Sequence, residues 1–262
     1  MAVASPGDAV PVLVTRPAGQ AGGLCAALED LGYRVHHQPL LELEPIGELG
    51  PGQRRIAMQL DLYQHVIFVS ANAVRLGMDC LADYWPQLPV GLNWYAVGEA
   101  TARRLESYGI RAVTPGETMS SEGLLALGPL QSVAGHRVLI VRGEGGRTLL
   151  REALSARGAR VEELACYRRK CPSLPAGTLG RLLETSGIQL ILVSSGEAMA
   201  NLQALLSPQE TTKFRHIGLL VPSQRVASLA AEEGFDHILV ADNASDAAML
   251  RAVQAFTPGS GE

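Results

Sequence analysis

The chain has 262 residues, of which 47% are hydrophobic and 18% charged, with a formal net charge of -4, enough for one large core or two of ordinary size. The slightly acidic balance gives no general attraction to nucleic acid. No stretch reaches the roughly 18 uninterrupted apolar residues that predict a membrane span, and the N-terminal residues lack the pattern of a secretion signal, so we expect a cytoplasmic protein.

Short β-branched runs alternate with longer helical patterns, which is typical of βα units on a parallel sheet. Strands are predicted at residues 11–15, 34–38, 65–70, 93–97, 111–114, 136–142, 160–166, 188–193, 217–221 and 237–240. Helices are predicted at residues 20–31, 72–83, 99–108, 121–128, 147–157, 176–185, 196–206, 223–233 and 246–255. Leu24, Leu28 and Leu31 have the spacing of a helix face packed on a sheet. Ten strands predict two five-stranded sheets.

The first βαβ segment occurs twice in the sequence. Over the 24 positions from Val12 to Val35, ten residues are identical to those found 126 positions later. Arg16 and Arg142 take equivalent places, directly after the first strand of each copy. Weaker similarities at an offset of 124 residues, and of 125 after one extra residue, extend the repeat, so two similar half-proteins are predicted.

The repeat alone does not locate the domain boundary, because tandem copies and a nested arrangement give the same order of units. Pro39–Gly52 and Tyr167–Pro175 break the pattern with prolines, and both follow the second strand of a repeated copy. Linkers at these points favour the nested arrangement. The predicted domains are residues 1–38 plus 173–262 and residues 53–166, with residues 39–52 and 167–172 as inter-domain connectors.

Small and polar residues follow most of the predicted strands, at the edge where open parallel sheets bind ligands. Each of these turns leads into a predicted helix, whose first N–H groups and positive dipole end favour an anion. The alternative is that Ser70, Ser194 and Ser223 only cap their helices. Six such turns in two domains favour an oxyanion-binding cleft, which Arg16 and Arg142 would face from opposite sides.

Other patterns favour less specific interpretations. The run from Arg142 to Arg147 lacks the spacing of the phosphate-binding glycine motifs, which makes a nucleotide-binding enzyme the weaker alternative. His36 and His37 have no third ligand in view and favour strand-end residues over a metal site, and the four cysteines favour unpaired thiols. Tyr167 lies beside a predicted connector, where a phenol could donate a proton to a leaving group or only pack the hinge.

Several segments together resemble the bacterial uroporphyrinogen-III synthase family. They are Leu13–Pro17, Ala96–Ala102, Leu139–Arg147, Cys166–Arg169, Val193–Glu197 and Val240–Ala244. With the strand pattern, the resemblance implies an α/β fold of two flavodoxin-like domains with parallel five-stranded sheets, joined by a two-stranded connector. It also implies cyclisation of linear hydroxymethylbilane to uroporphyrinogen III, with loss of water and inversion of ring D, and without a metal or organic cofactor.

The resemblance also implies roles for individual residues. Tyr167 matches the tyrosine expected to assist loss of hydroxide and is the predicted catalytic residue. The predicted substrate-binding residues are Arg16, Ser70, Asn72, Gly98, Thr101, Arg142, Gly143, Ser194, Ser195 and Ser223. We expect a monomer that binds a linear tetrapyrrole and makes transient contact with the upstream enzyme of the pathway. The alternative from another class is a two-domain protein that binds an anionic small molecule without catalysis.

Overall fold

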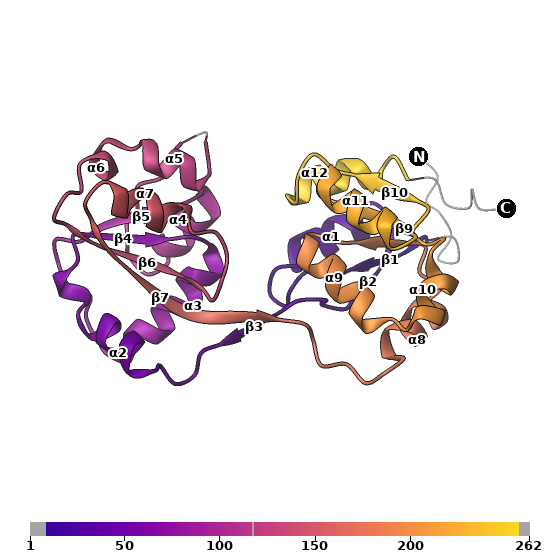
Figure 1. Ribbon diagram of the computed structural model, residues 1–262. Helices are drawn as coiled ribbons and strands as arrows, with labels where there is room; N and C mark the ends of the chain where they lie inside the picture. The colour runs from indigo at the N-terminus through magenta and orange to yellow at the C-terminus, as the bar shows by residue number, and fades with distance from the viewer. Residues whose placement is uncertain (1–8, 117, 257–262) are drawn as a thin grey trace. The chain divides into compact units, whose positions relative to one another are not determined.

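The computed structural model describes residues 9–116 and 118–256, so the ends of the first predicted domain, 1–8 and 257–262, lie outside the described residues. The chain forms two compact units: unit 1 runs to Glu42 and resumes at Lys170, and unit 2 is Leu43–Arg169. The chain passes from one unit to the other within β3 (Glu42–Pro45) and again within β7 (Arg160–Lys170). These two strands are hydrogen-bonded neighbours (Figure 1).

Unit 1 contains a five-stranded sheet in the order β10-β9-β8-β1-β2, and all four strand pairs are parallel. Its strands are β1 (Pro11–Val14), β2 (Arg34–His37), β8 (Leu190–Leu192), β9 (Gly218–Val221) and β10 (Ile238–Val240). The central strands β1, β8 and β9 are buried throughout, as expected for strands covered on both faces. One face packs against α1 (Gly22–Asp30) and α12 (Asp246–Val253). The other packs against α8 (Thr178–Thr185), α9 (Gly196–Leu205), α10 (Pro208–Phe214) and α11 (Gln224–Glu232).

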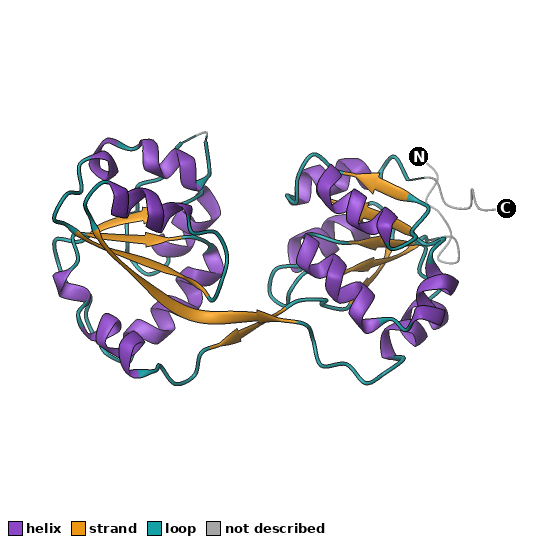
Figure 2. Ribbon diagram, in the orientation of Figure 1, coloured by secondary structure: helices purple, strands orange, loops and turns teal. Residues whose placement is uncertain are grey.

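Unit 2 contains a five-stranded sheet in the order β3-β7-β6-β4-β5, again with helices on both faces (Figure 2). Its further strands are β4 (His65–Phe68), β5 (Asn93–Ala96) and β6 (Arg137–Gly143). One face carries α2 (Pro51–Met58), the 3-10 turn η1 (Leu60–Leu62), α3 (Ala71–Ala82) and α4 (Glu99–Glu106). The other carries α5 (Ser121–Ala126), α6 (Gly128–Gln131) and α7 (Leu149–Ala156).

The prediction of two five-stranded sheets is confirmed in number, but the second sheet is mixed rather than all-parallel. Its fifth strand is β3, which lies inside the predicted connector 39–52. The predicted strand at 111–114 contributes only one bridge, in which Val113 donates to Trp94 O at 2.8 Å and accepts from Ala96 N–H at 3.0 Å. The next donor of that parallel ladder would be residue 115, which is a proline without an N–H, so the pairing ends there.

Two further predictions are wrong at the ends of elements. Leu24 and Leu28 are buried, but Leu31 is 46% exposed because α1 ends at Asp30. The strand predicted to end at residue 166 continues to Lys170, so Tyr167 lies inside a strand. Three helices, α2, α6 and α10, were not predicted at all, although all three carry a proline in the first turn, where proline is favoured.

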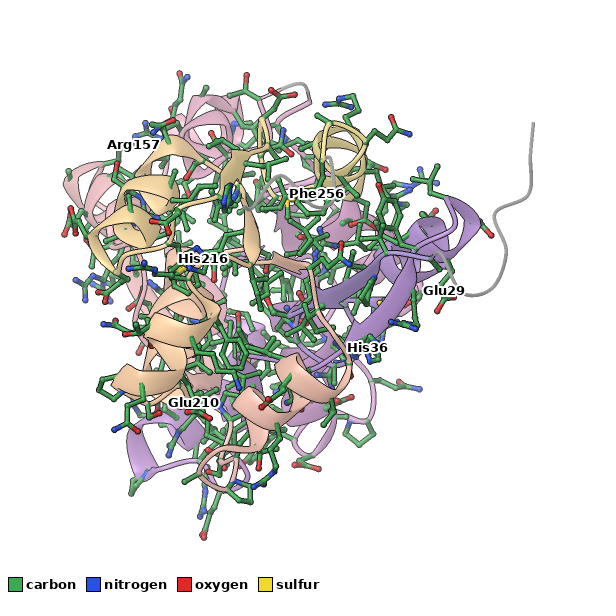
Figure 3. The ribbon with its side chains drawn as sticks, turned by 90° about the vertical axis from the view of Figure 1, so that its right-hand side faces the viewer. Glu29, His36, Arg157, Glu210, His216 and Phe256 are labelled. Atoms are coloured by element: carbon green, nitrogen blue, oxygen red, sulfur yellow. The ribbon has the colours of Figure 1, made fainter. Side chains whose placement is uncertain are left out.

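The adjacent histidines of β2 point to opposite faces of the sheet, as successive residues of a strand do. His37 Nε2 lies 2.9 Å from Arg16 O. The buried Nε2 of His36, the residue labelled in Figure 3, has no hydrogen-bond partner among the described residues. The four cysteines are free thiols, and Cys166 is the fully buried one. Within the described residues, no helix has both the length and the apolar character needed to cross a bilayer.

Candidate functional site

A cavity of about 330 Å³ lies in unit 2 at the carboxyl ends of its strands. Helix α3, which follows β4, and helix α7, which follows β6, pack on opposite faces of the sheet. The neighbouring strands β4 and β6 therefore form the switch point at which open α/β sheets bind ligands. The cavity is lined by Val69, Val97, Met119, Ser120, Ser121, Ile140, Arg142, Gly143, Gly145, Gly146, Arg147, Leu150, Tyr167 and Arg169.

Tyr167 is held in the wall of this cavity by its neighbours on two elements. It pairs with Gly143 across a register shift between Arg142 and Gly143, and its carbonyl accepts the Glu144 N–H at 2.7 Å. Tyr167 is 5% exposed, and its hydroxyl lies 3.4 Å from Ser70 Oγ. The predicted catalytic phenol therefore borders a cavity, and it does so from within strand β7.

The other predicted residues of unit 2 lie in the turns before α3 and α4. Ser70 is the N-cap of α3, and its Oγ accepts the Ala73 N–H at 3.1 Å, so this serine does cap its helix, in addition to its contact with Tyr167. Asn72 is half-buried in the first turn of the same helix. Gly98 is the extended residue before α4, whereas Thr101 is only 5% exposed within α4.

Arg142 binds the turn that follows its own strand. Its side chain is 13% exposed, and its guanidinium donates to Glu163 Oε1 at 2.6 Å and to the carbonyl of Arg147 at 3.0 Å. It also donates to the carbonyls of Gly143, at 3.3 Å, and Gly145. Arg142 thus fixes the loop that forms one side of the cavity, and its role as a direct substrate ligand stays a prediction.

The cavity lining is cationic. Among the described residues that line it, three are arginines and none is acidic. Arg147 is 80% exposed and lies 4.0 Å from Glu122, and Arg169 lies on the same strand as Tyr167 two residues later. Guanidinium groups bind carboxylates through paired hydrogen bonds. The lining therefore suits a ligand that carries carboxylates.

Sequence reasoning did not select four of the polar lining residues: Ser120, Ser121, Arg147 and Arg169. Two features of the sequence could have identified Ser120 and Arg169. Ser120 is the repeat equivalent of Ser245, and both serines cap a helix in the structure. Arg169 shares a face of its strand with Tyr167, because residues two apart point the same way.

The remaining predicted ligands belong to unit 1, at the ends of its own strands. Arg16 is 11% exposed and is paired with Asp246 at the start of α12. Ser195, rather than Ser194, caps α9 through a hydrogen bond of 3.1 Å from the Ala198 N–H. Ser223 precedes α11 but makes no side-chain cap bond. Their role as substrate ligands stays a prediction.

The thiol of Cys166, next to Tyr167 in the chain, is unreactive. Burial, and secondarily Cys80, raises the pKa of Cys166 to about 12, and its Sγ donates to Arg142 O at 3.2 Å. A neutral thiol is a poor nucleophile. Within residues 9–116 and 118–256, no group of three or more His, Cys, Asp or Glu side chains could hold a metal ion.

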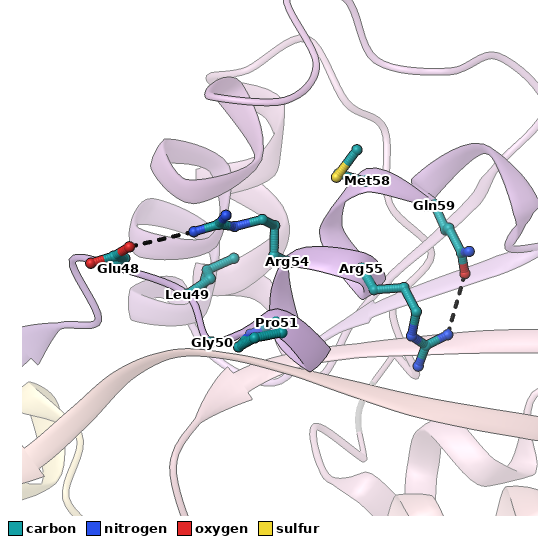
Figure 4. Close-up of a pocket in the computed structure, with 8 residues that line it drawn as sticks. All are labelled: Glu48, Leu49, Gly50, Pro51, Arg54, Arg55, Met58 and Gln59. Atoms are coloured by element: carbon teal, nitrogen blue, oxygen red, sulfur yellow. Dashed lines mark hydrogen bonds and ion pairs between the residues drawn. The ribbon is translucent and has the colours of Figure 1, made fainter.

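Figure 4 shows a larger depression, of about 740 Å³, beside α2. All of its lining residues lie between Glu48 and Gln59. Arg54 pairs there with Glu48 at 3.5 Å, and Arg55 binds Gln59 at 3.4 Å and Glu162 at 2.8 Å. A wall built from one stretch of chain brings no groups together from different strands, so the cavity beside Tyr167 is the stronger candidate.

Comparison with known sequences places the chain in a family. A family model described as "Uroporphyrinogen-III synthase HemD" matches residues 23–251. The uroporphyrinogen-III synthase of Escherichia coli (strain K12) is 36% identical over 251 residues, which cover 93% of this chain and 99% of that protein. The uroporphyrinogen-III synthase of Salmonella typhimurium is also 36% identical, over 253 residues and the same shares of the two chains.

Two solved structures share the fold at low sequence identity. The uroporphyrinogen-III synthetase of Helicobacter pylori 26695 has a TM-score of 0.58 at 16% identity, over 94% of this chain and 99% of that one. A mutant uroporphyrinogen III synthase of Thermus thermophilus has a TM-score of 0.54 at 20% identity, over 95% of this chain and 100% of that one. These similarities support the two-sheet α/β architecture.

Proposed function

This chain belongs to the uroporphyrinogen-III synthase family, and from that membership we propose that it acts at the cavity beside Tyr167. Its activity is that of a uroporphyrinogen-III synthase, a hydro-lyase of tetrapyrrole biosynthesis. The observation that carries the choice of site is that Tyr167 lines a cavity together with three arginines. Hydroxymethylbilane, the linear substrate, needs a proton donor near its terminal hydroxyl and cations for its carboxylates.

The first chemical step is the loss of water from the hydroxymethyl group. The pyrrole nitrogen pushes out the hydroxyl as the Tyr167 phenol transfers its proton to the departing oxygen, so that water leaves and a phenolate remains. The pyrrole N–H then returns a proton to that phenolate, which leaves a neutral azafulvene. Attack by the substituted carbon of ring D on this electrophile allows a spiro intermediate, which fragments and recloses with the ring inverted. The protein holds the chain in a cyclising shape.

The cavity size supports binding of one end of the substrate. A volume of about 330 Å³ is at the small end of the range for ligand pockets, roughly 300–1,000 Å³. It therefore suits part of a four-ring molecule, and Arg147 and Arg169 would bind the carboxylates of that part. Arg16, Ser194, Ser195 and Ser223 remain proposed ligands for further carboxylates. Ser70, Asn72, Gly98, Thr101, Arg142 and Gly143 remain proposed contributors from unit 2.

We also propose that both units are flavodoxin-like domains. Strands β1, β2, β8, β9 and β10 follow one another in unit 1 and stand in the spatial order 2-1-3-4-5, which is the flavodoxin order. In unit 2, strands β6, β7, β4 and β5, taken in that sequence, stand in the spatial order 2-1-3-4, and β3 lies beyond β7 at the edge of the sheet. The paired strands β3 and β7, in which the chain changes unit, support the predicted two-stranded connector.

The experiment is an isomer assay with freshly made hydroxymethylbilane. The wild type is expected to yield the type III ring, whereas the uncatalysed reaction yields type I. General acid catalysis typically contributes about 100-fold or more, so Tyr167→Phe should lower kcat by about that factor and shift the product toward type I. Tyr108→Phe, which removes a phenol at the exposed end of α4, is the matched control. Unchanged turnover by Tyr167→Phe would remove Tyr167 from the mechanism.

A further inference from the structure

We infer that Ser70 and Gly143 act as positioning residues for the Tyr167 phenol rather than as substrate ligands. Gly143 provides the surface on which the ring lies, and Ser70 donates a hydrogen bond to the phenol oxygen. The phenol's own proton is then directed toward the cavity. This inference rests on the proposed role of Tyr167 and adds two residues that position its phenol.

Gly143 leaves space that the Tyr167 ring occupies. A Cβ atom at residue 143 would lie 2.6 Å from ring Cε2 and 2.7 Å from Cζ. The register shift at Gly143 places it opposite Tyr167, and the bond from Glu144 N–H to Tyr167 O fixes the backbone there. The ring, rather than the strand, must therefore move to make room for a side chain.

The size of the Tyr167 ring movement determines how much the reaction rate falls. Moving the ring from 2.6 Å to an ordinary contact of 3.4 Å requires a shift of about 0.8 Å. A misplacement of about 1 Å can cost roughly 100-fold in rate, because catalysis depends on near-contact geometry. Cζ carries the hydroxyl, so the reacting oxygen moves with it. Glycine at residue 143 is thus required by the position of the phenol.

The position of Ser70 allows its hydroxyl to donate to the phenol. Its Oγ already accepts the Ala73 N–H at 3.1 Å, so its hydroxyl proton is available for the phenol oxygen 3.4 Å away. When Tyr167 gives up its proton, the phenolate has no proton of its own, and the Ser70 O–H stabilises the new charge. The positive end of α3 acts in the same direction. A resting distance of 3.4 Å is long for this bond, and such bonds shorten as the transition state forms.

A double-mutant cycle tests the role of Ser70. Ser70→Gly removes the hydroxyl with little loss of helix stability, because glycine is tolerated at an N-cap. A hydrogen bond to a charged oxygen corresponds to about 10-fold or more in rate, so we expect kcat to fall about 10-fold or more, with KM little changed. In the Tyr167→Phe background the same substitution should have no further effect on kcat. Ser70→Thr, which restores a hydroxyl, should recover activity.

Two controls isolate the effect of the phenol. Ser207→Gly removes another N-cap serine, whose Oγ accepts the Glu210 N–H at 3.3 Å in unit 1, and should leave kcat unchanged. Gly143→Ala should lower kcat about 100-fold, whereas Gly52→Ala, where a Cβ would meet nothing within 4 Å, should not. All variants are first compared with the wild type by circular dichroism.

The outcomes separate this inference from the proposed function. If Tyr167→Phe lowers kcat but Ser70→Gly lowers it equally in both backgrounds, Ser70 acts independently of the phenol and the inference is overturned. The same holds if Gly143→Ala raises only KM, because Gly143 would then contact substrate. If Tyr167→Phe itself has no effect, the proposed function of Tyr167 fails and the inference fails with it.

Discussion

The ion-pair network on β7 makes a specific prediction about acid stability. The Glu162 carboxylate accepts hydrogen bonds from Arg137 at 2.7 Å, from the Tyr63 hydroxyl at 2.7 Å and from Arg55 at 2.8 Å. Burial would raise the pKa of Glu162, but these bonds outweigh it and lower the pKa to about 2. Glu162→Gln removes the charge with little change in shape, so it measures what that charge contributes.

The lowered pKa of Glu162 gives the size and the sign of its contribution to the free energy of unfolding. A pKa lowered from 4.5 to about 2 corresponds to at most about 3.4 kcal/mol at neutral pH. Because the network is partly solvated, with Arg55 55% exposed, screening reduces this to about 1–2 kcal/mol. A lowered pKa means that the contribution is present above pH 4.5 and is lost as the pH falls toward 2.

Urea unfolding followed by tryptophan fluorescence is a suitable assay, because both tryptophans, Trp85 and Trp94, lie in unit 2. At pH 7, Glu162→Gln should lower the free energy of unfolding by about 1–2 kcal/mol. At pH 3 the difference should be less than half of that value. Glu48→Gln, whose side chain is 90% exposed, should change stability by less than about 0.5 kcal/mol. An equal loss for Glu162→Gln at both pH values would refute the reasoning.

Three further predictions follow from the packing of unit 2. Arg142→Met removes the donors that hold the turn after β6, so kcat/KM should fall about 10-fold or more; an unchanged kcat/KM would show that the turn holds without them. Burial, and then the neighbouring His136, whose Nδ1 lies 3.0 Å from His65 Nε2, lowers the pKa of His65, so an NMR titration should place the His65 midpoint below 6.5; a higher midpoint would contradict this effect of burial. Gly77→Ala places a Cβ 2.5 Å from Val141 Cγ1 and should destabilise by about 1–3 kcal/mol in urea unfolding, and a more stable variant would disprove this tight packing.

The buried parallel strands could be predicted from sequence because burial on both faces leaves continuous apolar runs. β3 could not, because the segment Glu42–Pro45 contains two glutamates and a proline, lies among further prolines and is not buried throughout. The segment around Val113 shows the opposite error, because a strand was predicted there and only one bridge forms. Its β-branched residues are not sufficient for a strand, since Pro115 lacks the N–H that would make the next hydrogen bond of the ladder. Local propensity thus identifies strands that carry continuous apolar runs and misses a strand such as β3, whose residues are not buried throughout.

For the candidate site, Tyr167 could be selected from the sequence, but the residues that contact it could not. Tyr167 was selected by resemblance, and its strand position follows once β7 is extended. The contact of Gly143 with the ring depends on a register shift, which leaves no mark in the sequence. Arg16 and Arg142 occupy equivalent repeat positions but bind different partners, Asp246 and Glu163, because those acids come from segments that do not correspond in the repeat.

The most direct test of the central claim, that the Tyr167 phenol assists the loss of water, is a single-turnover measurement with enzyme in excess of hydroxymethylbilane. Chemical quenching separates the rate of ring formation from binding and product release. For Tyr167→Phe we predict a rate of type III ring formation about 100-fold or more below that of the wild type, with the same dependence on enzyme concentration. A wild-type rate of type III formation by Tyr167→Phe would contradict the account.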